Sequence, residues 1–231
     1  MPITISGSTG ISGVDGTASS PAVRGADTNT GVFYPAADQV AIATGGVQRL
    51  LVDASGNATL TGTLQVGGVA AAMYPLVLGT AVASTSGTSI DFTGVPSWVR
   101  RVTVMLSGVS TNGTSRYRFQ LGSSAGVVTS GYTGSNTVFG TTTLTTASQT
   151  AGFDVVSDAA ANTHDGLIQF VLLNPTTNIW VGNGGFARGN SNVTYITSGS
   201  ITLPGALDRV RLTTLSGTDT FDAGSINILY E

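Results

Sequence analysis

The residues of this chain with the greatest capacity for chemistry are one histidine and three aspartates. His164 is the only histidine, and Asp154, Asp158 and Asp165 lie close to it in the sequence. Serine-type hydrolysis needs an oriented histidine–acid pair, and glycoside cleavage needs two carboxyl groups roughly 5 to 9 Å apart on a rigid groove. The Gly-x-Ser-x-Gly run at residues 122–126 is not followed by a helix, as a nucleophile elbow requires, and the aspartates stand in TASQTAGFDVVSDAAANTHDG, a run of small residues that favours a flexible loop. We therefore interpret the aspartates as solvated turn residues, assign His164 to an Asp-Gly hairpin turn, and predict no enzymatic activity.

Binding chemistry is concentrated in two glycine-rich segments that combine aromatic rings, amides and one arginine. Such a mixture stacks on sugar faces and hydrogen-bonds to hydroxyls. We interpret these segments, residues 130–136 and 178–190, as surface loops, and the alternative for Trp180 is a place in the interior. The glycine runs 122–126 and 182–185 are not followed by Lys-Ser or Lys-Thr, so we interpret both as hairpin loops rather than phosphate cradles. The candidates for receptor contact are Tyr132, Asn136, Trp180, Asn183, Arg188 and Asn192.

Composition narrows the classes of partner. Only 9% of the residues are charged, the net charge is -3, and all nine basic residues are arginine. A nucleic-acid site needs clustered positive charge, and the chain has no basic block, so we expect no nucleic-acid partner. There is no cysteine and no apolar run of the roughly 18 residues that a membrane span requires. Nor is a signal peptide readable at the start. We expect no metal and no cofactor.

The elements that must position these residues are all predicted strands, divided between two regions. Residues 1–68 form the first region, in which short strands alternate with turn chemistry such as Gly45-Gly46. Its apolar side chains are enough to cover one face of a ribbon and too few to enclose a core. A second and a third copy of the chain would complete it, so we predict a trimerising strand-and-turn region. The inward candidates are Val32, Val40, Ile42, Leu50, Val52, Leu60 and Leu64.

Residues 69–231 form the second region, where apolar and polar residues alternate with the period of two expected of strands. No segment has sustained helical periodicity. About ten short strands in roughly 160 residues suit one antiparallel β-sandwich, jelly-roll-like in architecture. The chain is therefore predicted to be all-β. The predicted core of the sandwich is Phe92, Trp98, Val102, Val104, Phe119, Leu121, Phe170, Leu172, Ile201 and Ile228.

One stretch of the first region resembles a known family. The run SPAVRGADTNTGVFYPAADQVAIATGGVQRLLVDASGN is similar to an element of tailed-phage fibre and virion proteins that has the pattern D-T-x-T-G-[VI]-[FY], then D-x-[VIL]-x-[IV]-x-[TN]-x-G, then R-[LI]-x-[VI]-x-x-x-G. The second region, with VPSWVRRVTVMLSGVSTNGTSRYRFQLG and the terminal GTDTFDAGSINILYE, is similar to carboxy-terminal β-domains of phage tail fibres. The resemblance implies a homotrimeric virion component that mounts on the particle at one end and meets the host at the other. It transfers no catalytic residue.

These observations favour a homotrimeric tail fibre or tail-tip adhesin located in the virion. Its expected partners are other copies of itself, other phage tail or virion proteins, and a glycan or protein of the host surface. Two alternatives stay open: a capsid, head-fibre or collar decoration protein without receptor binding, and a glycan-degrading tailspike. The latter would require Asp154, Asp158 or Asp165 to converge in a groove.

Overall fold

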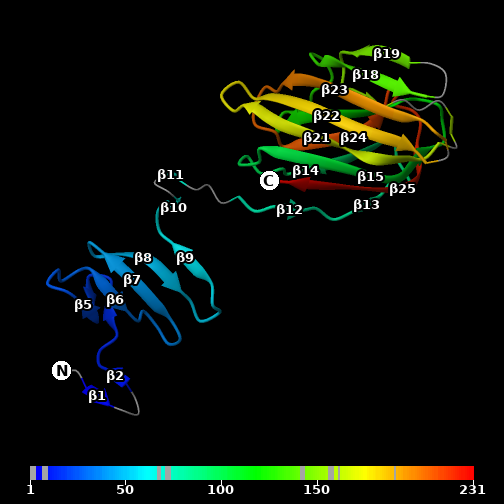
Figure 1. The fold of residues 1–231 in the computed structure, drawn as a ribbon. Coiled ribbons are helices and arrows are strands. Elements are labelled where there is room, and N and C mark those ends of the chain that lie inside the picture. Colours follow the sequence, from blue (N-terminus) through cyan, green and yellow to red (C-terminus); the bar gives the residue numbers. More distant parts are fainter. Residues whose placement is uncertain are drawn as a thin grey trace. The chain divides into compact units, whose positions relative to one another are not determined.

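The protein is all-β and divides into two compact units (Figure 1). The structure is a computed structural model that describes residues 4–6, 10–66, 69–70, 74–140, 144–155, 159–160, 162–189 and 191–231. The two units are residues 1–73 and residues 74–231. From the sequence, this boundary is predicted between residues 68 and 69. No helix occurs among the described residues.

The first unit is built around a five-stranded antiparallel meander in which each strand pairs with the next along the chain. Short hairpins precede and follow it. Its strands are β5 (Val23–Arg24), β6 (Gly31–Phe33), β7 (Val40–Thr44), β8 (Val47–Val52) and β9 (Ala58–Leu60), and the hairpin strands are β1 (Thr4–Ser6), β2 (Gly10–Ser12), β3 (Gly16–Thr17), β4 (Ser20–Pro21), β10 (Gln65–Val66) and β11 (Val69–Ala70).

The second unit is a sandwich of two antiparallel sheets. The large sheet runs in the order β12-β25-β15-β21-β22-β23-β18-β19, and β13 also pairs with β25. Its strands are β12 (Val77–Leu78), β13 (Val82–Ala83), β15 (Arg101–Thr111), β18 (Thr133–Phe139), β19 (Leu144–Gln149), β21 (His164–Asn174), β22 (Ile179–Arg188), β23 (Thr194–Thr202) and β25 (Phe221–Tyr230). The small sheet has the order β14-β24-β16-β17, with β20 beside β16, and consists of β14 (Ser89–Thr93), β16 (Tyr117–Ser123), β17 (Gly126–Val127), β20 (Phe153–Val155) and β24 (Arg209–Thr214).

The chain passes repeatedly from one sheet to the other, as in a jelly roll. From β14 to β25 the chain alternates between the small sheet and the large sheet. The three-stranded meander β21–β22–β23 occupies the position of a single strand in a jelly roll. Seven of the ten predicted core residues are buried, and Phe92, Trp98 and Leu172 pack against that core while partly exposed. The sandwich therefore has its own hydrophobic core, as predicted.

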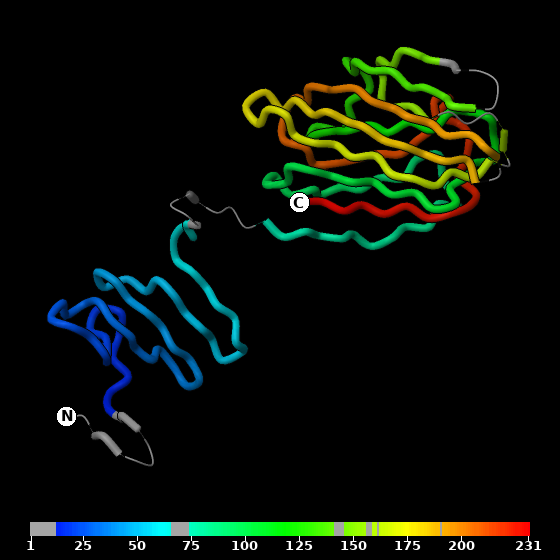
Figure 2. Tube along the Cα trace, in the orientation of Figure 1, coloured from blue at the N-terminus to red at the C-terminus, as the bar shows by residue number. Residues whose placement is uncertain are grey.

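The chain enters the sandwich along the edge of its final strand. Val77 and Leu78 pair with Tyr230 and Leu229, and β13 pairs with β25 further along. Figure 2 shows this entering segment beside the last strand. Ser84 ends the segment with two hydrogen bonds to β25 backbone carbonyls, from its amide to Gly224 and from its hydroxyl to Ala223.

Two sequence interpretations of turns were wrong. His164 starts β21 and is fully buried against Tyr117 and Tyr195, so the Asp-Gly pair that follows it lies inside a strand. The glycines 182–185 lie inside β22. A Cβ at Gly182 would come within 2.9 Å of the Phe153 and Phe170 rings, so this glycine makes room for core aromatics. The 122–126 run does form the predicted hairpin, between β16 and β17.

Candidate interaction surfaces

In the part of the first unit that the structure describes, one face of the sheet has no cover. Among the described residues, the enclosed core of this unit consists of Phe33, Ala41 and Ala43, with Ala18 and Leu51 packed against them. The opposite face carries an unbroken row of aliphatic partners across all five strands, because Val23 pairs with Val32, Val32 with Ile42, Ile42 with Leu50, and Leu50 with Leu60. We call the exposed and half-buried side chains of this face the N-terminal aliphatic face: Val23, Val32, Val40, Ile42, Leu50, Val52 and Leu60.

Six of the seven inward candidates proposed from the sequence thus lie on one face, and in a single chain this face meets water. The seventh, Leu64, is exposed after the end of β9 and is not part of this face. Leu60 is 53% exposed and Ile42 is 41% exposed. Burial of such side chains contributes about 25 cal/mol per Å² of apolar surface. Burial of apolar surface stabilises the small core on the other side only slightly, since two of its three members are alanines.

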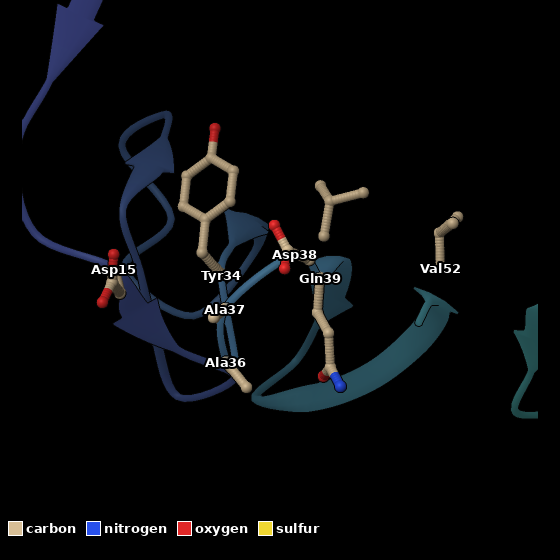
Figure 3. Close-up of a pocket in the computed structure, with 8 residues that line it drawn as sticks. Asp15, Tyr34, Ala36, Ala37, Asp38, Gln39 and Val52 are labelled. Atoms are coloured by element: carbon tan, nitrogen blue, oxygen red, sulfur yellow. The ribbon is translucent and has the colours of Figure 1, made fainter. Parts of the chain in front are cut away.

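A shallow cavity of about 540 Å³ adjoins the aliphatic face at the turn before β7. Asp15, Tyr34, Asp38 and Gln39 contribute its polar groups, and Val40 is part of its apolar lining. Figure 3 shows Tyr34 and Asp38 pointing to the same side and Gln39 to the other. Asp38 has a φ of 59°, the left-handed region that aspartate tolerates in turns. Among the described residues, no three histidine, cysteine, aspartate or glutamate side chains gather at one place.

Three of the six predicted contact residues lie in the interior of the sandwich. Trp180, Tyr132 and Asn136 are 1%, 4% and 3% exposed. Trp180 is a core residue, the alternative that the sequence left open. Asn136 donates to the backbone carbonyl of Asp154 from within strand β18, which the sequence interpretation had taken for a loop. A receptor cannot reach these side chains in this conformation, so their role is structural.

Tyr132 joins the two sheets through its hydroxyl. Its oxygen accepts a hydrogen bond from the Leu121 amide at 2.8 Å and donates to the Val128 carbonyl at 3.0 Å. Its ring meets Phe153 edge to face, with ring centroids 5.5 Å apart. Burial raises the pKa of Tyr132 to about 12, because the phenolate would lose its hydration.

The other three candidates lie at the surface. Asn183 is exposed in the middle of β22, facing away from the core. Arg188 ends β22 half-buried, with its guanidinium 5.7 Å from the centre of the Tyr195 ring. Asn192 is exposed in the loop between β22 and β23. The Arg188 amide donates to Val193, which closes this loop.

The aspartates considered for catalysis have structural partners instead. Asp154 accepts two hydrogen bonds from Arg118, at 2.7 and 2.9 Å, in a mostly buried ion pair. Asp165, on the other sheet, accepts from the Gly108 amide at a bulge in β15. Asp158 lies outside the described residues. The two described carboxylates are therefore on different sheets, each engaged in holding the fold together.

The outer face of the large sheet was not singled out by the sequence interpretation. Leu167, Val171, Val181 and Ile196 point outward and are each about two-fifths exposed. They surround a pair of exposed amides, Gln169 and Asn183, which are direct partners across β21 and β22. The signal in the sequence is the run GLIQFVLL at residues 166–173, which is apolar at almost every position. We call the following residues the large-sheet outer face: Met105, Leu167, Gln169, Val171, Val181, Asn183 and Ile196.

Comparisons of the chain with protein-family models, with curated proteins and with solved structures find no match. In the part of the chain that the structure describes, no helix is long and apolar enough to cross a membrane.

Proposed function

We propose that this protein is a structural component of a tailed-phage virion, a homotrimeric tail fibre or tail-tip adhesin that attaches the particle to the host cell surface. The observation that carries the proposal is the N-terminal aliphatic face. Three copies turned toward a common axis would remove these seven side chains from water, which a single chain does not do. The similarity of residues 20–57 to a phage fibre element supports the same assembly.

In this proposal the first unit mounts the protein on the particle through other tail or virion proteins, and the sandwich meets the host. Arg188 and Asn192 are the contact candidates that lie at a loop end of the sandwich. Three copies on one rigid body multiply weak contacts through effective concentration, so each contact with a host glycan or protein can be shallow. No enzymatic step is needed for attachment.

The first test is the native mass of the purified chain by light scattering. We expect about three times 23.2 kDa. Leu60→Asp should weaken the trimer, because each copy then forfeits about 1 kcal/mol of half-side-chain burial. Three copies lose about 3 kcal/mol, on the order of a 100-fold increase in the dissociation constant. Thr59→Asp is the matched control, since Thr59 is also exposed on β9 and points to the opposite face.

The second test separates attachment from decoration. Purified protein should compete with phage for host cells and lower adsorption, and Asn192→Ala should compete less well than the unchanged chain. A protein that labels the head in electron micrographs and leaves adsorption unchanged would instead be a decoration protein. Release of reducing ends from host polysaccharide would point to a tailspike.

A further inference from the structure

We propose that a small cavity at one end of the sandwich binds a short-chain carboxylate, held by the indole N–H of Trp180 and the guanidinium of Arg100. The cavity lies where β22 begins, whereas Arg188 ends β22 and Asn192 follows it. The site is therefore separate from the loop end that the proposed function assigns to the host, and the inference goes beyond attachment.

The cavity has a volume of about 130 Å³ and is formed by three connections between strands. These are the loop from β14 to β15, the hairpin from β21 to β22 and the loop from β23 to β24. Of its lining residues, Ser97, Arg100 and Ala206 are exposed, whereas Val99 and Trp180 are buried. The cavity thus extends from the surface of the protein toward the interior of the sandwich.

The indole nitrogen of Trp180 is a buried donor in need of an acceptor. Trp180 is 1% exposed and forms part of the cavity wall. Its Nε1 has no hydrogen-bond partner among the residues that the structure describes. A buried indole N–H usually has a partner, because an unpaired buried donor is costly. A receptor surface does not reach this side chain, but an acceptor group of a few atoms can approach it through the cavity.

Arg100 supplies positive charge at the rim of the cavity. Its Nη1 donates to the backbone carbonyls of Ser97 and Val99, at 3.0 and 3.1 Å, which holds the guanidinium against the loop that forms the cavity. The neighbouring Arg101 pairs with Glu231, whereas Arg100 has no carboxylate partner within the described part of the chain. Because a guanidinium also donates from Nε and Nη2, Arg100 can bind a ligand without leaving its loop.

The lining favours a carboxylate over other chemical groups. Arginine and tryptophan side chains donate hydrogen bonds and accept none, so the ligand must supply the acceptor. No acidic side chain is among the described residues that line the cavity. A carboxylate loses hydration when it enters, and a facing arginine offsets this cost. The remaining walls include Leu172, Pro175 and Leu207, which suit a short carbon chain.

The volume of the cavity limits the length of the ligand. An apolar cavity of about 150 Å³ holds benzene, so one of about 130 Å³ suits a smaller molecule such as acetate or propionate. A whole sugar is too large, and only the carboxyl end of an acidic sugar would enter. For so few atoms we expect a dissociation constant that is roughly millimolar.

The test observes the indole N–H directly, since Trp98 and Trp180 are the two tryptophans of the chain. The full chain is labelled with ¹⁵N-tryptophan, and Trp98→Phe assigns the two indole signals. Propionate is then added at neutral pH. We expect the Trp180 signal to shift until it saturates, and the signal of Trp98, whose ring stacks on Tyr74, to shift less.

Arg100→Gln should raise the dissociation constant for propionate about 10- to 100-fold, because it removes a charge-assisted hydrogen bond. Arg100 is exposed, so the substitution leaves the core intact. Arg101→Gln is the matched control, because Arg101 is the adjacent arginine and is not among the residues that line the cavity. It should bind propionate as the parent chain does.

Three results would overturn the inference. The first is a Trp180 signal that does not move at propionate concentrations far above the millimolar range, which would leave the cavity to water. The second is an equal shift with 1-propanol, which has no carboxylate, or unchanged binding by Arg100→Gln. The third is tighter binding of glucuronate than of propionate, which would make an acidic sugar the occupant. The proposed function is tested separately, since propionate binding by a chain with a monomeric mass would support this inference and contradict the trimer.

Discussion

Replacing Tyr132 with phenylalanine distinguishes an interior role of this residue from a role in receptor contact. The substitution keeps the ring against Phe153 and removes only the hydroxyl, which leaves the buried Leu121 amide without its acceptor. A buried donor that loses its partner costs about 1–3 kcal/mol. For a chain of this size 1 kcal/mol corresponds to about 2–4 °C, so the Tm should fall by roughly 2–12 °C.

The assay is thermal or urea unfolding followed by tryptophan fluorescence, together with adsorption of phage to host cells. Tyr74→Phe is the control, since the Tyr74 ring stacks on Trp98 at the surface, 5.3 Å away, and is 46% exposed. It should leave the Tm unchanged. If Tyr132→Phe kept the full Tm and instead reduced adsorption, the reasoning that places its hydroxyl in the interior would be refuted.

Three further predictions follow from the packing of the sandwich. Gly184→Ala should lower the free energy of unfolding by about 1–3 kcal/mol through overpacking, since its Cβ would lie 2.7 Å from Ile168 in the core. Gly185→Ala is the control, because the space around its Cβ is open, and it should leave the urea unfolding midpoint unchanged. Asp154→Ala leaves the mostly buried Arg118 without its partner and should lower the free energy of unfolding by about 3 kcal/mol. Asp91→Ala breaks a pair that is about one-third exposed and should lower it by less than about 1 kcal/mol in the same urea titration. Because the pKa of Tyr132 is raised to about 12 from its ordinary 10, its contribution to stability is complete below pH 10 and is lost as the pH rises toward 12. Over this pH range the free energy of unfolding of Tyr132→Phe should therefore fall less steeply than that of the parent chain. Equal slopes of the free energy of unfolding against pH would contradict the assignment.

The sequence predicts the all-β sandwich well because its central strands alternate. Val102, Val104, Phe119, Leu121 and Phe170 were identified as core residues and are fully buried. Period-two alternation reports directly on which side of a sheet a residue faces. Where a strand has strong alternation and large side chains, pattern alone locates the core.

Strands made of small polar residues were missed for the converse reason. The hairpin of β18 and β19 is rich in serine and threonine, and it was interpreted as a loop. Its position depends on pairing with β23, a long-range contact that no local pattern reports. Tyr132 and Asn136 were therefore expected at the surface.

Glycine misled the interpretation in a second way. Glycine runs usually mark turns, because glycine adopts positive φ without strain. In β22 the core-facing glycines are selected by the size of their neighbours, Gly182 by two phenylalanine rings and Gly184 by Ile168. The sequence contains no local sign of these neighbours, which belong to other strands. The same error turned Asn183 into a loop residue, whereas it lies in the middle of a sheet.

The segment through which the chain enters the sandwich has a mechanical consequence. From Tyr74 to Ser84 the chain is held to β25 by a few edge contacts, and its firmest anchor, the fully buried Ser84, is at the far end. A load applied to the first unit would peel Val77 and Leu78 away first and stop at Ser84. At about 3.3 Å per extended residue, this releases roughly 30 Å of slack without disturbing the core of the sandwich. Under such a pull, this edge segment of the second unit would yield before the folded body bears the load.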